Sequence, residues 1–91
     1  GVYLNRTPRK APNTDLDLRG MRVDEAISRV DEALNDAVLD GVGSIRIIHG
    51  KGTGALRQGV WRHLAGHGAI EKFDFAPRDR GGDGATEVSL A

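Results

Sequence analysis

The chain has 91 residues, of which 38% are apolar, 29% charged and 4% aromatic, a composition that is typical of one small globular domain and excludes a second. It has no cysteine, which excludes disulfides, cysteine zinc sites and thiol nucleophiles and favours a reducing, cytoplasmic setting. Lys and Arg balance Asp and Glu at 13 each, so no overall basic field indicates a nucleic-acid partner.

Residues 1–14 contain Pro8 and Pro12 among basic residues and show no apolar periodicity. They are predicted to form a flexible arm, the linker from a longer parent protein, and residues 15–91 the folded domain. No apolar run approaches the roughly 20 residues of a membrane span, so no membrane partner is expected.

The first predicted element is a strand at residues 15–19. Polar and apolar residues alternate there, which places Leu16 and Leu18 on one face and Asp17 and Arg19 on the other. Such a strand is half-buried.

A long amphipathic helix is predicted next. Apolar residues between Val23 and Val38 recur at spacings of three and four, which forms one apolar stripe. Asp24 and Glu25 favour the positive end of this helix, and Gly41 can supply the left-handed residue after its last turn.

Residues 44–49 are rich in β-branched side chains and predict a second strand. Ile45 and Ile47 are expected to point inward and Arg46 outward. A glycine turn at 50–54 leads to a second predicted helix, which carries Leu56, Val60 and Leu64, has Thr53 as its candidate N-cap and ends near Gly66 or Gly68. Two more strands are predicted at 70–76 and 86–90, with a turn at 81–84 between them.

The order β-α-β-α-β-β predicts a two-layer α/β sandwich. Right-handed crossovers put both helices on one face of the sheet and leave the other face open. Four charged residues are expected on that open face: Asp17, Arg19, Arg46 and Glu87.

The glycine turn is the strongest local signal for function. Alternating glycines between a strand and a helix permit positive φ and a close approach of the backbone, and free N–H groups favour an anion such as phosphate. Its spacing differs from the P-loop and from the dinucleotide fingerprint, so nucleotide hydrolysis and hydride transfer are not supported. The alternative is a tight connection in which the glycines serve only geometry.

Phosphodiester cleavage is the chemistry that the neighbouring residues suit. His49 and Arg19 both follow strand ends, where ligands gather in open sheets, and they are expected to meet if the strands are neighbours. His49 would shuttle a proton, Asp17 would orient it or hold a cation, and Lys51 would steady the phosphate. Taken singly, a backbone-bonded histidine and a surface ion pair explain the same residues.

Two other groups are predicted to be structural. His63 and His67 are four residues apart on the second helix, but two glycines weaken that helix and no carboxylate completes a metal triad nearby. Trp61 falls near the apolar stripe and is expected at the edge of the core, so a stacking platform for single strands is not supported.

The motifs Leu16-Asp17-Leu18-Arg19-Gly20, His49-Gly50-Lys51-Gly52-Thr53-Gly54 and Gly81-Gly82-Asp83-Gly84-Ala85-Thr86-Glu87-Val88 together resemble the signatures of the Smr (small MutS-related) domain. The resemblance covers residues 15–90. It is greatest to the Smr domain of the bacterial MutS paralogues that lack the mismatch-recognition domain. Many Smr proteins carry His where Arg19 stands.

This resemblance implies a fold like the C-terminal domain of translation initiation factor 3, with sheet order 1-2-4-3. It also implies a nicking endonuclease for DNA or RNA within a larger, dimeric MutS-family ATPase that acts in recombination suppression, DNA repair or rescue of stalled ribosomes. The isolated domain is expected to be a monomer. The implied catalytic residues are Asp17, Arg19, His49 and Lys51, and the implied nucleic-acid contacts are Gly50, Gly52, Thr53, Gly54, Arg57, Arg46 and Glu87.

The sequence shows no evident ligand set for Mg²⁺ or Mn²⁺ and lacks a second acidic cluster, so it leaves both a metal-assisted and a metal-independent reaction open. The main alternative to an enzyme is a module that binds DNA, RNA or a ribosomal surface without chemistry. A protein-interaction domain that uses Arg46 and Ile48 on the open sheet is the third reading.

Overall fold

The computed structural model describes residues 14–91. The predicted arm therefore lies outside the described residues, except for Thr14, whose carbonyl accepts a hydrogen bond from the backbone N–H of Arg46 at 2.7 Å. No helix among the described residues is long and apolar enough to cross a bilayer.

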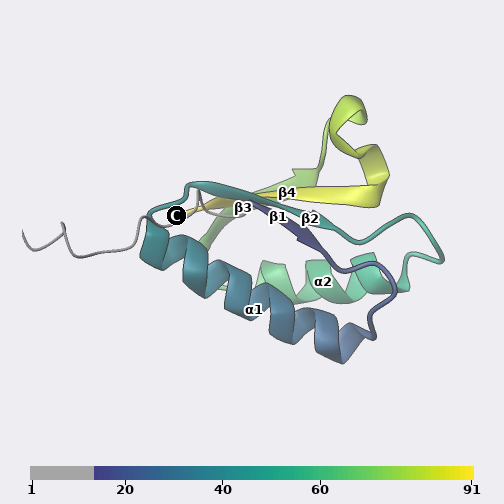
Figure 1. Ribbon diagram of the computed structural model, residues 1–91, viewed down its shortest axis with the longest axis horizontal. Coiled ribbons are helices and arrows are strands. Elements are labelled where there is room, and N and C mark those ends of the chain that lie inside the picture. Colours follow the sequence, from purple (N-terminus) through teal and green to yellow (C-terminus); the bar gives the residue numbers. More distant parts are fainter. Residues whose placement is uncertain (1–13) are drawn as a thin grey trace, which may run out of the picture.

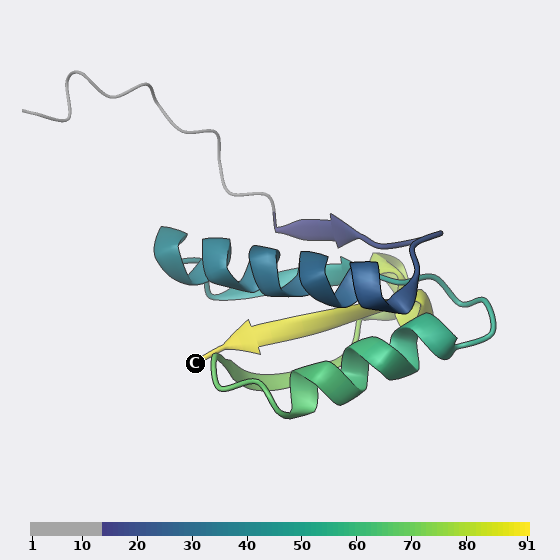
Figure 2. The same cartoon turned by 90° about the horizontal axis from the view of Figure 1, so that it is seen from below.

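The domain has two layers, with one sheet and two helices packed on one of its faces (Figures 1 and 2). The helices are α1 (Val23–Asp40) and α2 (Ala55–Ala65), and the strands are β1 (Asp15–Asp17), β2 (Ser44–Ile48), β3 (Ile70–Phe75) and β4 (Ala85–Leu90). This confirms the predicted α/β sandwich and its element order.

The sheet has the order β1-β2-β4-β3, as the resemblance implied. β1 runs parallel to β2, and β4 is antiparallel to both of its neighbours. The register pairs Asp17 with Ile48 and Ile48 with Ala85. The carboxyl ends of β1 and β2 therefore meet the start of β4 at one end of the sheet.

Alternation along the strands separates the core from the open face. Leu16, Leu18, Ile45 and Ile47 are buried against the helices, whereas Arg46 points to the other side. Strand β4 adds Val88, and the helices add the rest of the core: Ala26, Val30, Leu34, Ala37, Val60 and Leu64. Trp61 packs against this core from its edge, as predicted.

Helix α1 starts and stops where its sequence predicts. At its start the Glu25 carboxylate accepts the backbone N–H of Arg22 at 3.3 Å, and Gly41 ends it with φ 71°. Helix α2 differs in one detail, because its N-cap is Gly54 and not Thr53. The Thr53 hydroxyl still accepts a hydrogen bond from the N–H of Ala55 at 3.3 Å.

The turn predicted between the last two strands is more structured than expected. It contains two short 3-10 helices, η2 (Arg78–Arg80) and η3 (Gly82–Gly84). Figure 1 shows this segment rising from the sheet on the side opposite the helices. It thereby forms a wall at the edge of the open face.

Candidate nucleic-acid interface

The glycine loop between β2 and α2 is bonded to the segment that precedes β4. The carbonyl of Gly84 accepts the N–H groups of both His49, at 3.1 Å, and Gly50, at 2.8 Å. Two stretches that are far apart in the sequence, 49–54 and 78–84, therefore form one rim at the end of the sheet.

The predicted positive φ of the loop glycines is confirmed. Gly50 has φ 78°, and Gly52 and Gly54 also lie in this region, at 32° and 85°. At Gly50 a Cβ atom would lie 3.3 Å from Cγ of Arg19, so glycine also lets the Arg19 stem cross the loop closely. The loop backbone and Arg19 thus form one surface.

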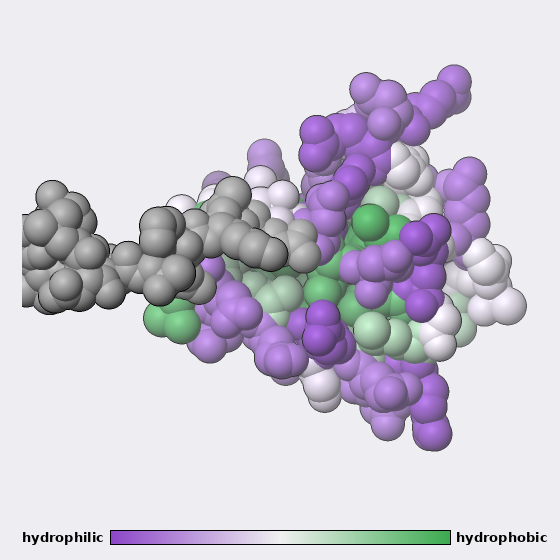
Figure 3. All heavy atoms as spheres, viewed as in Figure 1, coloured by the Kyte–Doolittle hydropathy of each residue, from purple (hydrophilic) through white to green (hydrophobic). Residues whose placement is uncertain are grey.

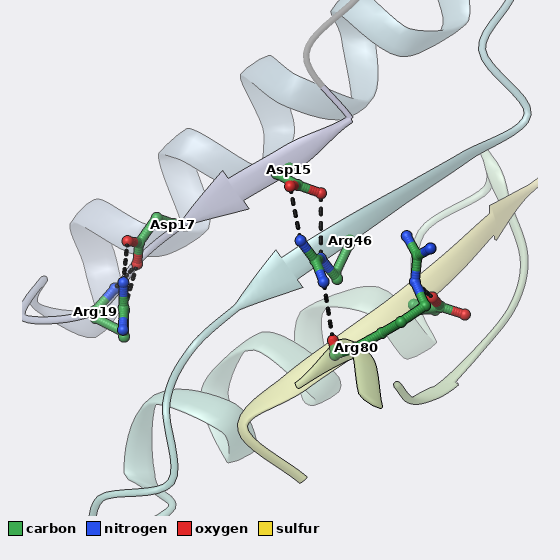
Figure 4. Close-up of polar contacts among 6 residues, drawn as sticks. Asp15, Asp17, Arg19, Arg46 and Arg80 are labelled. Carbon is green, nitrogen blue, oxygen red and sulfur yellow. Dashed lines mark hydrogen bonds and ion pairs between the residues drawn. The ribbon is translucent and has the colours of Figure 1, made fainter. Parts of the chain in front are cut away.

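Asp17 and Arg19 form a two-pronged ion pair on the open face (Figure 4). The Arg19 Nε donates to Oδ1 at 2.9 Å and Nη2 donates to Oδ2 at 2.7 Å. The Arg19 backbone N–H also donates to Oδ1, at 3.1 Å. Through the side-chain bonds first and the backbone bond second, Arg19 lowers the pKa of Asp17 to about 2. Asp17 therefore acts as the carboxylate that orients Arg19, and it is a poor proton acceptor.

This arrangement predicts a measurable titration. Removing the partner in Arg19→Ala is expected to return the pKa of the Asp17 carboxyl from about 2 toward 3.8, as followed by NMR of the side-chain carbon. Because the folded pKa is depressed, the contribution of the pair to stability is present above the unfolded pKa and is lost as pH falls through the folded one. An Arg29→Ala variant should leave the Asp17 titration unchanged, and an unchanged pKa in Arg19→Ala would refute the assigned cause.

Lys51 extends from the loop toward the same area as Arg19. Its Nζ lies 3.4 Å from Oδ1 of Asp83, and its side chain is 75% exposed. A Cβ atom on Gly84 would lie 3.4 Å from Cγ of Lys51, so its stem lies against the Gly84 segment. Arg19 and Lys51 line one hollow together with Gly50.

A chain of ion pairs and hydrogen bonds crosses the open face (Figure 4). It includes Arg46 and Glu87, which are both predicted to contact nucleic acid. Arg46 donates to both carboxylate oxygens of Asp15, at 3.1 and 2.7 Å, and its Nη1 donates to the carbonyl of Arg80 at 3.0 Å. Arg80 in turn lies 3.1 Å from Glu87. The Asp15 hydrogen bond is the main cause that raises the pKa of Arg46. This chain of contacts fixes the 3-10 segment to the sheet.

The predicted meeting of His49 and Arg19 is wrong. His49 is 5% exposed and continues the inward-facing series of Ile45 and Ile47, so its ring lies on the helix side of the sheet. Arg19 continues the outward-facing series of Asp17. The two residues follow neighbouring strands but point to opposite faces, and the proton-shuttle role rested on their meeting.

The His49 ring is held by a buried chain of hydrogen bonds. Its Nδ1 lies 2.9 Å from the Gly50 carbonyl, and its Nε2 lies 2.8 Å from Oγ1 of Thr86. The indole N–H of Trp61 donates to the same Thr86 oxygen at 2.7 Å. A ring protonated at Nδ1 satisfies every group, because Gly50 can only accept and the Thr86 hydroxyl can then donate to Nε2. His49 therefore joins the glycine loop to β4 and α2.

Arg57, predicted to contact a neighbouring phosphate, lies on the helix side of the loop. Its guanidinium stands 5.5 Å from the ring centre of Trp61 and 5.7 Å from that of Phe75. It lines a second hollow, of about 340 Å³, together with His49, Lys51 and the rest of the glycine loop. The loop thus separates two hollows, with Arg19 and Arg57 in different ones.

The residues do not fit a resident divalent cation. Asp17 is the only acid of the predicted catalytic group, and its two oxygens already accept from Arg19. Within residues 14–91, no cluster of three or more His, Asp or Glu side chains is arranged to hold a metal. His63 and His67 instead lie 2.6 and 3.6 Å from one oxygen of Asp31.

Two residues at this end of the domain have functions that the sequence motifs do not predict. Thr86 lies in a motif, but only the structure shows that its hydroxyl joins His49 and Trp61. Arg80 lies outside the predicted site residues, although it lines the hollow that contains Arg19 and Lys51. A signal for Arg80 was available, because an Arg-Asp-Arg run directly after Pro77 adds charge to a turn beside the site.

Comparisons with known proteins agree with the fold. The Smr domain family matches residues 16–91. The protein named Endonuclease MutS2 of Carboxydothermus hydrogenoformans is 49% identical over 87 residues, which cover 96% of this chain and 11% of that protein. The one of Geobacillus kaustophilus is 51% identical over 76 residues, covering 84% and 10%. This chain therefore spans about a tenth of the length of those relatives.

Solved structures match over most of the chain. The Smr domain of Thermus thermophilus MutS2 superposes with a TM-score of 0.84 at 45% identity, and the match covers 86% of this chain and 98% of that one. YdaL, a stand-alone small MutS-related protein from Escherichia coli, gives a TM-score of 0.82 at 29% identity, with 88% and 66% covered.

Proposed function

The chain belongs to the Smr domain family, and we propose that it is a nucleic-acid-binding domain that nicks a phosphodiester backbone with low sequence specificity. The similarity to proteins named Endonuclease MutS2 supports this activity. The chemistry proposed is hydrolysis, in which water supplies a hydroxyl group to phosphorus and a proton to the departing ester oxygen.

The observation that carries the proposal is the pair of cations in one hollow beside the Gly50 backbone. Arg19 is held rigidly by Asp17, and Lys51 extends from the adjacent loop. A phosphate placed between them meets a planar guanidinium and an ammonium, which stabilise the extra negative charge of the transition state. Asp17 orients Arg19, and His49 fixes the loop from the inner face of the sheet.

The target is DNA or RNA, because a hollow that recognises the phosphate accepts either backbone. In a longer parent protein the same nick would serve recombination suppression, DNA repair or the rescue of stalled ribosomes. These roles follow from the family and are part of the proposal.

A specific observation favours a second candidate, a module that binds without cutting. Arg19 lowers the pKa of Asp17 to about 2, which makes that carboxylate a poor proton acceptor, and neither Asp17 nor the buried His49 lines the hollow that contains Arg19 and Lys51. On this alternative, Arg19 and Lys51 only bind the backbone.

Salt dependence tests the binding that both candidates share. The affinity for a nucleic-acid duplex is expected to fall linearly on a plot of log affinity against log salt, because each neutralised phosphate releases counterions. Fluorescence anisotropy of a labelled duplex measures it, and Lys51→Ala should make the slope shallower by about one phosphate contact. Affinity that stays constant from low to moderate salt would contradict a phosphate site.

Nicking separates the two candidates. Supercoiled plasmid and structured RNA are incubated side by side with the domain, with and without a chelator. The nuclease proposal expects nicked circles or cut RNA that depend on Arg19, whereas the binding module expects retention of the nucleic acid with no new ends.

A further inference from the structure

The hollow beside Arg19 and Lys51 extends well beyond those two residues. Its volume is about 460 Å³, and it reaches across the open face to the 3-10 segment. Figure 3, which views the sheet from its edge, shows hydrophilic side chains projecting above the sheet, on the side of the 3-10 segment. The residues that line it are Arg19, Arg46, Ile48, Gly50, Lys51, Arg80, Gly81, Gly84 and Ala85.

The charged side chains that line the hollow are all positive. Four of its lining residues are cations, and none of the described residues that line it is acidic. The acids that pair with these cations stand outside the lining: Asp15, Asp17, Asp83 and Glu87. The walls are therefore suited to an anion.

The floor of the hollow is apolar. Ile48 points outward from β2 and is paired in register with Ala85 of β4. Ile48 is partly exposed, although it stands in a row of charged neighbours on this face. A ligand that fits has a flat or apolar part for Ile48 and negative charge for the walls, which is the chemistry of a nucleotide.

We propose that this hollow holds one unpaired nucleotide of the bound strand, with its base on Ile48 and its phosphates between Lys51 and Arg80. This inference rests on the proposed function and adds a substrate class to it: single strands and unpaired stretches, in preference to intact duplex. In a duplex the bases are stacked and paired, so a base must leave the stack before it can enter such a hollow. A strand that is already unpaired avoids that cost.

Arg46 is a positioning residue for the 3-10 segment that borders the hollow. Arg46 holds the Arg80 carbonyl at 3.0 Å while Asp15 holds Arg46 from the other side. The Arg80 side chain, 57% exposed, is thereby kept above the sheet, where it can contact a phosphate. Arg46 shapes the hollow and Arg80 contacts the strand.

The test compares a labelled oligothymidine strand with a blunt duplex of the same length, by anisotropy at low salt. Arg80→Ala and Ile48→Thr are expected to weaken single-strand binding by about fivefold to tenfold and to leave duplex binding unchanged. Thermal unfolding establishes that both variants are folded. Arg78→Ala, in the same 3-10 helix, is the matched control and should change neither affinity.

The outcomes separate this inference from the proposed function. If Arg19→Ala weakens both substrates while Arg80→Ala and Ile48→Thr weaken neither, or weaken both equally, the nucleotide subsite is refuted and the phosphate site stands. Equal effects of Arg78→Ala and Arg80→Ala would also refute it. If neither nucleic acid binds, the proposed function fails together with the subsite.

Discussion

His49→Ala is expected to lower the free energy of unfolding by about 2–4 kcal/mol, since the change removes a buried ring, takes away the acceptor of the Thr86 hydroxyl proton and leaves the Gly50 carbonyl without its ring donor. For a domain of this size the midpoint of thermal unfolding should fall by roughly 10–25 °C. Circular dichroism during heating measures it.

The same variant should lose nicking even though its ring does not face the hollow. His49 connects the glycine loop to β4, so without it Gly50 and Lys51 are no longer held beside Arg19. Nicking is measured well below the unfolding midpoint of the variant, so that a loss of nicking reflects displacement of the loop and not unfolding of the domain. Thr86→Val, which removes the hydroxyl and keeps the shape, should reproduce part of both effects.

His63→Ala is the matched control for this experiment. Its ring contacts the half-exposed Asp31 on the helix layer, so the free energy of unfolding should fall by no more than about 1 kcal/mol. Wild-type stability together with full nicking in His49→Ala would show that the buried chain of hydrogen bonds has no role at the site.

Arg19→Ala is expected to reduce the nicking rate by about 100- to 1,000-fold, the usual cost of removing one donor to the transition state. The free energy of unfolding should change little, because an exposed ion pair contributes little to stability. Arg19→Lys should recover only a small part of the rate, since an ammonium cannot reproduce the two parallel bonds to Asp17. Supercoiled plasmid converted to nicked circles gives the rate.

Arg29→Ala, an exposed arginine on α1, is the control for lost positive charge and should nick at the wild-type rate. An unchanged rate in Arg19→Ala would exclude Arg19 from the chemistry and would favour the binding module. A large loss of stability in the same variant would instead assign Arg19 a structural role.

The period-two pattern of the strands was sufficient to predict most of the fold. Leu16, Leu18, Ile45 and Ile47 face the helices because apolar side chains alternate on a pleated strand, and the stripe on α1 follows from the helical repeat. The position of β4 between β2 and β3 depends on a long-range pairing that local pattern does not encode. It was expected from the family resemblance alone.

The site was only partly predictable for the same reason. Residue type and glycine spacing pointed to Arg19, Lys51 and the loop, but the orientation of His49 was misjudged. The alternation that puts Ile45 and Ile47 inward continues to His49, and that signal was present in the sequence. The contacts of Thr86 and Arg80 join residues tens of positions apart, so only the folded chain brings them together.

The hydrogen bond from Trp61 to Thr86 links the fluorescence of the indole to the anchor of the glycine loop. Trp61 is the one tryptophan in the sequence, and its indole shares the Thr86 oxygen with the ring that anchors the glycine loop. Ultraviolet emission from this indole should therefore shift when the anchor is released. This intrinsic fluorescence should follow the release of the anchor in real time, without an attached dye.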